Sequence, residues 1–140
     1  MTLAKSCYVL DAGAIEARID ELCDVLTDCV TRGASVSFVL PFTCSKARAF
    51  WHDVAQSAGR GERVVLALDN PSGVIVGTVQ LILKQPENQP HRADVAKLLV
   101  HSSARRQGFA RQLMTALETC AIQQQKTQLV LDTATGSDAE

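Results

Sequence analysis

The chain has 140 residues, enough for one domain with a buried core, and 46% of them are hydrophobic, as in globular rather than disordered proteins. Its net charge of -1 lacks the basic excess that nucleic acids and anionic membranes attract. No apolar run approaches the roughly 18 residues of a membrane span, and the start of the chain is too weakly apolar for a signal peptide. We therefore expect a cytoplasmic domain with no nucleic-acid or membrane partner.

The cysteines point to thiols rather than to disulfides or metal. There are 5 of them, an odd number, and their spacings match no zinc motif. They are Cys7, Cys23, Cys29, Cys44 and Cys120. We expect reduced, mostly buried thiols and no metal site.

The first half of the chain predicts a strand, two helices and an antiparallel hairpin. The expected elements are a strand at 6–10, helices at 14–32 and 43–57, and strands at 63–68 and 74–83. In the first helix apolar residues recur at steps of three and four, and Gly33 follows at the usual place for a helix end. Thr43 is a candidate N-cap, and the turn-rich residues 69–73 join the hairpin strands.

The second half predicts a strand–helix–strand unit. The expected elements are a strand at 94–100, a loop at 101–106, a helix at 108–125 and a short strand at 129–131. The two strands of this unit should be parallel, with a right-handed crossover. No linker suggests a second domain, so we expect residues 1–140 to form a single domain of the α/β class with a mixed (α+β) sheet.

The most informative stretch is residues 98–111, where a buried strand leads through a loop into a helix. The first turn of a helix has free N–H groups and a partial positive charge, which bind phosphate oxygens. Gly108 allows close approach of a ligand, and Arg105, Arg106 and Arg111 add positive charge. The loop lacks the features of a Walker A or dinucleotide-binding loop. Spacing alone leaves open an ordinary strand-to-helix turn with solvated arginines.

The pattern Arg105-x-x-Gly108-x-Ala110, which follows a strand ending Leu98-Leu99-Val100, resembles motif A of the GNAT N-acetyltransferase superfamily. The expected order of elements is also similar to that family's. The resemblance implies the GNAT acyl-CoA N-acyltransferase fold, acetyl-CoA as cosubstrate and a small-molecule amine as acceptor. It also implies that the loop N–H groups hold the coenzyme A pyrophosphate and that the strand backbone binds the pantetheine arm. The implied coenzyme-binding residues are Leu98, Leu99, Val100, Arg105, Arg106, Gln107, Gly108, Phe109, Ala110 and Arg111.

Within that superfamily the chain most resembles the tabtoxin acetyltransferases, which acetylate a toxin amine. The matching pieces are scattered but ordered. They include Gly33-Ala34-Ser35-Val36, Arg92-Ala93-Asp94-Val95, Ser103-Ala104-Arg105, Arg111-Gln112-Leu113-Met114 and Leu131-Asp132-Thr133. This resemblance implies a toxin or antibiotic-like amine as the acceptor.

Asp94 is the better candidate for a general base. An amine like that of lysine has a pKa of about 10.4, so roughly one molecule in a thousand is uncharged at pH 7 and a base is needed. Strict alternation along the strand places Asp94 on one face with Ala96, Leu98 and Val100. The resemblance implies a glutamate base at this spacing, and the shorter aspartate would then need a water relay.

Both candidate acids also have a structural interpretation. For Asp94 the alternative is an ion pair with Arg92 or Lys97 at the start of a strand. Asp132 follows the last strand, at the end where parallel sheets build their sites, and the resemblance implies a role in catalysis or substrate binding. Its alternative is a loop acid that caps the turn at 133–137.

The resemblance also implies elements that this chain lacks. GNAT domains usually continue after the fifth strand with a helix and two strands, and a tyrosine on that helix often protonates the leaving thiolate. The sequence stops at Glu140 and its only tyrosine is Tyr8, so we expect a C-terminally truncated fold with no assigned general acid. A homodimer could cover the open sheet edge. A non-catalytic module that binds coenzyme A or a partner remains the alternative, and His101 is expected to be a loop histidine.

Overall fold

A computed structural model describes residues 7–32, 43–84, 92–104 and 108–131. Its strands are β1 (Cys7–Leu10), β2 (Arg63–Asp69), β3 (Ile75–Ile82), β4 (Arg92–Val100) and β5 (Gln128–Leu131). Its helices are α1 (Ala12–Ala17), α2 (Ile19–Thr31), α3 (Cys44–Gly59) and α4 (Phe109–Gln123). The strands form one sheet in the order β1-β2-β3-β4-β5. Only the β4–β5 pair is parallel, which confirms the predicted mixed α/β class.

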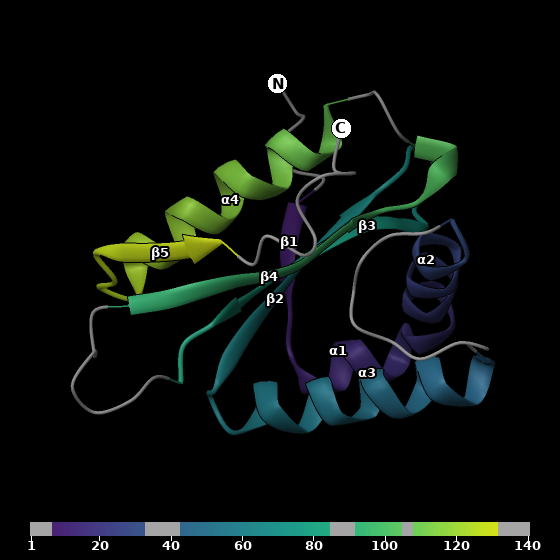
Figure 1. Ribbon diagram of the computed structural model, residues 1–140, viewed down its shortest axis with the longest axis horizontal. Coiled ribbons are helices and arrows are strands. Elements are labelled where there is room, and N and C mark those ends of the chain that lie inside the picture. The colour runs from purple at the N-terminus through teal and green to yellow at the C-terminus, as the bar shows by residue number, and fades with distance from the viewer. Residues whose placement is uncertain (1–6, 33–42, 85–91, 105–107, 132–140) are drawn as a thin grey trace.

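Helices cover both faces of the sheet and produce two separate cores (Figure 1). α1, α2 and α3 pack on one face, and α4 packs alone on the other. Trp51 of α3 is fully buried, and its indole N–H donates to the carbonyl oxygen of Leu22 at 3.1 Å, which joins α3 to α2. None of the helices in the described ranges has the length and hydrophobicity of a membrane span.

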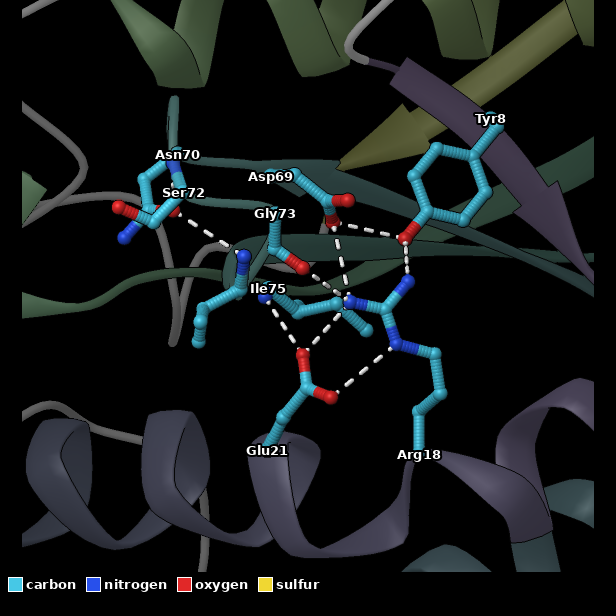
Figure 2. Close-up of polar contacts among 9 residues, drawn as sticks. Tyr8, Arg18, Glu21, Asp69, Asn70, Ser72, Gly73 and Ile75 are labelled. Carbon is cyan, nitrogen blue, oxygen red and sulfur yellow. Dashed lines mark hydrogen bonds and ion pairs between the residues drawn. The ribbon is translucent and has the colours of Figure 1, made fainter.

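The single helix expected at 14–32 is in fact two helices. Arg18 separates α1 from α2 with φ -113° and ψ 26°. Its guanidinium donates to the carbonyl oxygen of Gly73 at 2.8 Å and to Glu21 at 2.6 Å (Figure 2). Because the apolar spacing continues through Ile15 and Ile19 on either side, the pattern that predicted the helix could not reveal the break.

Tyr8 belongs to the same polar network (Figure 2). Its hydroxyl donates to Asp69 Oδ1 at 2.7 Å and accepts a hydrogen bond from Arg18. Glu21 accepts the backbone N–H of Ile75 at 2.8 Å. Burial and the hydrogen bond to Asp69 raise the pKa of Tyr8, and the Arg18 guanidinium lowers the pKa of Glu21. The network ties β1 and the α1–α2 junction to the β2–β3 turn.

Candidate active site

A bulge interrupts β4 in the middle of the strand that carries the candidate base. Val79 of β3 faces two residues, Lys97 and Leu98, because the register passes over both between Ala96 and Leu99. Two residues opposite one define a β-bulge, and such bulges concentrate near active sites. Lys97 has φ 56°, a left-handed conformation that costs a non-glycine residue about 1 kcal/mol or more.

The bulge overturns the prediction that Asp94 shares a face with Leu98 and Val100. Leu98 and Val100 belong, with Ala93, to the core under α4, whereas Leu99 belongs to the core under α1–α3. Since Asp94 alternates with Ala93, its side chain is on the α1–α3 face. Strict alternation failed here because one inserted residue reverses the facing of all that follow.

Asp94 forms the ion pair that was its structural alternative. Its Oδ1 lies 3.0 Å from Nε of Arg92, and 34% of the Asp94 side chain remains exposed. On the neighbouring strands it faces Ile82 and Val130. Asp94 therefore has an ionised partner and access to water, and its role as a base remains a prediction.

Among the described residues, β5 pairs with the first part of β4. The last pair between described residues is Val95 with Leu131, which is also the last described residue of the chain. On the other side, the N–H of His101 donates to the carbonyl oxygen of Val76 at 2.7 Å. Because amide directions alternate along a regular strand, the N–H group of Val100, next to His101, points away from β3.

The N-terminus of α4 presents backbone donors. Gly108 is its N-cap, with φ 77° and ψ 13°, and no side chain in the described ranges caps it. The first bond within the helix runs from the N–H of Gln112 to the carbonyl oxygen of Gly108 at 3.1 Å. The N–H groups of Phe109, Ala110 and Arg111 therefore have no acceptor within the helix. The helix dipole would stabilise an anion bound to them by about 0.3–1 kcal/mol.

An acid on α2 holds the turn between β4 and α4. Asp28 accepts the backbone N–H and the hydroxyl of Ser102, both at 2.8 Å. Burial acts to raise the pKa of Asp28, but the hydrogen bonds from Ser102 outweigh it and the pKa lies below its usual range. Sequence reasoning missed this contact, for which the only signal was an acid on the polar face of α2.

His101 takes part in the same turn, as expected for a loop histidine. Its Nδ1 accepts the N–H of Ser103 at 3.0 Å. Its Nε2 lies 3.2 Å from Asp24 and 3.8 Å from Asp28. Both ring nitrogens therefore face partners on the turn and on α2.

The other predicted site residues are distributed as follows. Leu98, Leu99 and Val100 are buried on β4, and the exposed side chain of Arg111 lines a groove between α4 and β1. Arg105, Arg106, Gln107 and Asp132 lie outside the described residues. Within the described part of the chain, no group of three or more His, Cys, Asp or Glu side chains is arranged to hold a metal ion.

Comparison with solved structures shows the fold at low sequence identity. An aminoglycoside acetyltransferase from an uncultured soil metagenomic sample, in complex with sisomicin, is 14% identical with a TM-score of 0.65, over 90% of this chain and 75% of that one. The ribosomal-protein-alanine N-acetyltransferase of Brucella melitensis is 18% identical with a TM-score of 0.69, over 89% and 72%. An N-acetyltransferase of Staphylococcus aureus Mu50 is 18% identical with a TM-score of 0.69, over 89% and 70%.

The sequence also matches a family model over most of its length. The model describes the acetyltransferase (GNAT) family and matches residues 21–139. The matched range includes α2 from Glu21 onward, the whole of β4 with its bulge, and the N-terminus of α4. The chain therefore belongs to the GNAT family of acetyltransferases.

Proposed function

We propose that this protein transfers an acetyl group from acetyl-CoA to a primary amine of a small molecule. The observation that carries the proposal is the junction at the end of β4. Among the described residues, β4 runs past its last pair with β5 and leads to the N-terminus of α4, which no described side chain caps. The junction supplies a strand edge and a set of backbone donors side by side.

The residues of this junction fit the two halves of coenzyme A. The N–H groups of Phe109, Ala110 and Arg111 would hold the pyrophosphate, with charge from Arg105 and Arg106. The edge of β4 around Leu98 would pair with the amide-rich pantetheine arm as a short added strand. Its N–H groups would also polarise the thioester carbonyl.

Acetyl transfer would proceed by direct attack. The amine nitrogen bonds to the carbonyl carbon, the C–S bond breaks, and the thiolate leaves. Asp94 accepts the proton of the amine through a water, because its short side chain is held by Arg92. Asp132, the second candidate acid, would contribute to catalysis or to amine binding.

Two observations support a small acceptor. The net charge of -1 offers no surface for a nucleic acid. The soil metagenomic acetyltransferase with a related fold is in complex with sisomicin. Together with the tabtoxin acetyltransferase resemblance, this favours a toxin or antibiotic-like amine.

The second candidate function is a coenzyme A-binding module without turnover. It is favoured by the position of Tyr8, the only tyrosine of the sequence. Tyr8 lies on β1, three strands away from β4, and its hydroxyl is hydrogen-bonded to Asp69 and Arg18. Tyr8 therefore lies far from the strand at which the thiolate would leave. The predicted homodimer that covers the edge of the sheet is compatible with both candidate functions, and it stays a prediction.

A pair of matched glycine variants tests the coenzyme site. Gly108 and Gly61 have nearly the same φ, 77° and 78°, and a Cβ atom added at either would meet no atom of the described residues within 4 Å. Gly108→Glu and Gly61→Glu should therefore carry similar strain, but only Gly108→Glu places a carboxylate at the phosphate donors. We expect Gly108→Glu to weaken acetyl-CoA binding at least about 100-fold by calorimetry, as repulsion replaces a charged contact.

The same preparations distinguish the two functions. Thiol release over a panel of amines, measured beside calorimetry, would support the transferase if binding is accompanied by turnover. Binding without turnover would support the module. Equal binding by the Gly108→Glu and Gly61→Glu proteins would remove the coenzyme site from the start of α4.

A further inference from the structure

A groove separates α4 from the edge strand β1 on the face of the sheet that α4 covers. Its volume is about 510 Å³. Ligand pockets commonly measure about 300–1,000 Å³, so the groove is large enough for a small molecule. β1 contributes Cys7 and Val9, and Val9 is 56% exposed. The groove begins at Arg111, in the first turn of α4, and runs along the helix away from the junction with β4.

The lining is apolar along its length and positive at one end. Leu66, Ala116 and Cys120 contribute apolar surface beneath and beside the opening. Among the described residues that line the groove, Arg111, in the first turn of α4, is the only charged one, and none is a carboxylate. In the described part of the chain no acid lies within ion-pair distance of Arg111. The groove therefore complements a molecule with an apolar body and an anionic end.

The helix sets the length of that molecule. The lining follows α4 from Arg111 to Gln123, and at about 1.5 Å per residue this run spans about 18 Å. The hydroxyl of Thr119 donates to the carbonyl oxygen of Thr115 at 3.3 Å, so it already has an acceptor and needs none from a ligand. An extended alkyl chain of medium length, with its head group at Arg111, fits within this run and matches its polarity.

We propose that this groove binds a medium-chain fatty carboxylate. The carboxylate pairs with the side chain of Arg111, and the alkyl chain lies between β1 and α4 against Leu66 and Ala116. The backbone N–H of Arg111, by contrast, belongs to the proposed coenzyme site. The first turn of α4 would then contact both ligands through different atoms.

Cysteine labelling tests the proposal without any assay of acetyl transfer. Cys7 lines the groove and is partly exposed, whereas Cys44 is exposed and lies outside it. Decanoate, at about ten times its Kd and below its micelle concentration, should slow alkylation of Cys7 by N-ethylmaleimide about tenfold. The rate at Cys44, followed by mass spectrometry in the same sample, should not change.

Two variants and a neutral analogue locate the ligand within the groove. Ala116→Phe fills the groove, and Arg111→Gln removes its charge, so each should weaken decanoate binding about tenfold or more. Decanol should bind wild type and Arg111→Gln equally. Ile122→Phe adds an aromatic ring to an exposed position of the same helix and should bind decanoate as wild type does.

Several results would overturn the proposal. They are equal protection of Cys44, equal affinity for decanoate and decanol in the wild type, or unchanged decanoate binding in Arg111→Gln. Unchanged binding in a folded Ala116→Phe protein would do the same. If Ala116→Phe does not fold, Arg111→Gln and the decanol comparison still decide.

Discussion

The hydroxyl of Thr78 has no hydrogen-bond partner among the described residues, although the side chain is fully buried. On the neighbouring strands it faces Leu99 and Ala67, both part of the core under α1–α3. An unsatisfied buried hydroxyl destabilises a fold. Thr78→Val should therefore raise the free energy of unfolding by about 1 kcal/mol, measured in urea.

Thr119→Val is the matched control, because the exposed Thr119 hydroxyl already donates to the carbonyl of Thr115. It should change stability by less than about 0.5 kcal/mol. A loss of stability in Thr78→Val would mean that a bound water or a ligand satisfies the Thr78 hydroxyl.

Asp94 allows a prediction at the level of rate. If it accepts the proton of the amine, Asp94→Asn should lower kcat about 100-fold, near the small end of general-base effects, because a water intervenes. The deficit should shrink as the pH approaches the pKa of the amine, since the free base then needs no help. Steady-state measurements of kcat from pH 6 to 10, at intervals of about one pH unit, would separate the two profiles.

Asp53→Asn, at an exposed acid of α3, serves as the control and should keep the wild-type profile. A parallel profile for Asp94→Asn, reduced equally at every pH, would assign Asp94 to positioning through Arg92 instead of proton transfer.

At the scale of elements, Asp28 connects α2 to the turn before α4. Because the folded pKa of Asp28 is lowered, its stabilisation is present above the unfolded value of about 3.9 and is lost as the pH falls through the folded pKa. At pH 7, Asp28→Asn should cost about 1.5–3 kcal/mol, the usual range for hydrogen bonds to a charged group. The difference from wild type should disappear in strong acid.

Hydrogen exchange at the amide of Ser102 is the local readout, and it should accelerate in Asp28→Asn before global unfolding does. Asp20→Asn changes an exposed acid on the same helix and should leave that amide protected. Unaltered exchange at Ser102 in Asp28→Asn would show that the turn is held by other contacts.

The elements were largely predictable because their signals are local. Apolar periodicity located α2 and α4, and the N-cap Thr43 located α3. Turn residues located the β2–β3 hairpin, and crossover rules gave the parallel β4–β5 pair. Gly108 was also recognisable as the residue that opens α4. The break at Arg18 was not, because it depends on the carbonyl of Gly73, far along the chain.

At the scale of the whole molecule, the errors come from long-range contacts and from one inserted residue. The bulge at Lys97 depends on the register between β3 and β4, which alternation within β4 does not encode. The ties of Ser102 to Asp28 and of Tyr8 to Asp69 join residues that the chain separates widely. Such pairs cannot be inferred from spacing, and they hold the candidate site in place.

The bulge in β4 also bears on how this chain can change in length over generations. Since Lys97 is the supernumerary residue, a gene that lost its codon would leave Leu98, Leu99 and Val100 in contact with their present cores. Loss of Leu99 instead would send Val100 to the opposite core. Shortening at Lys97 would thus straighten the strand without inverting it, so the architecture would survive the loss of the bulge.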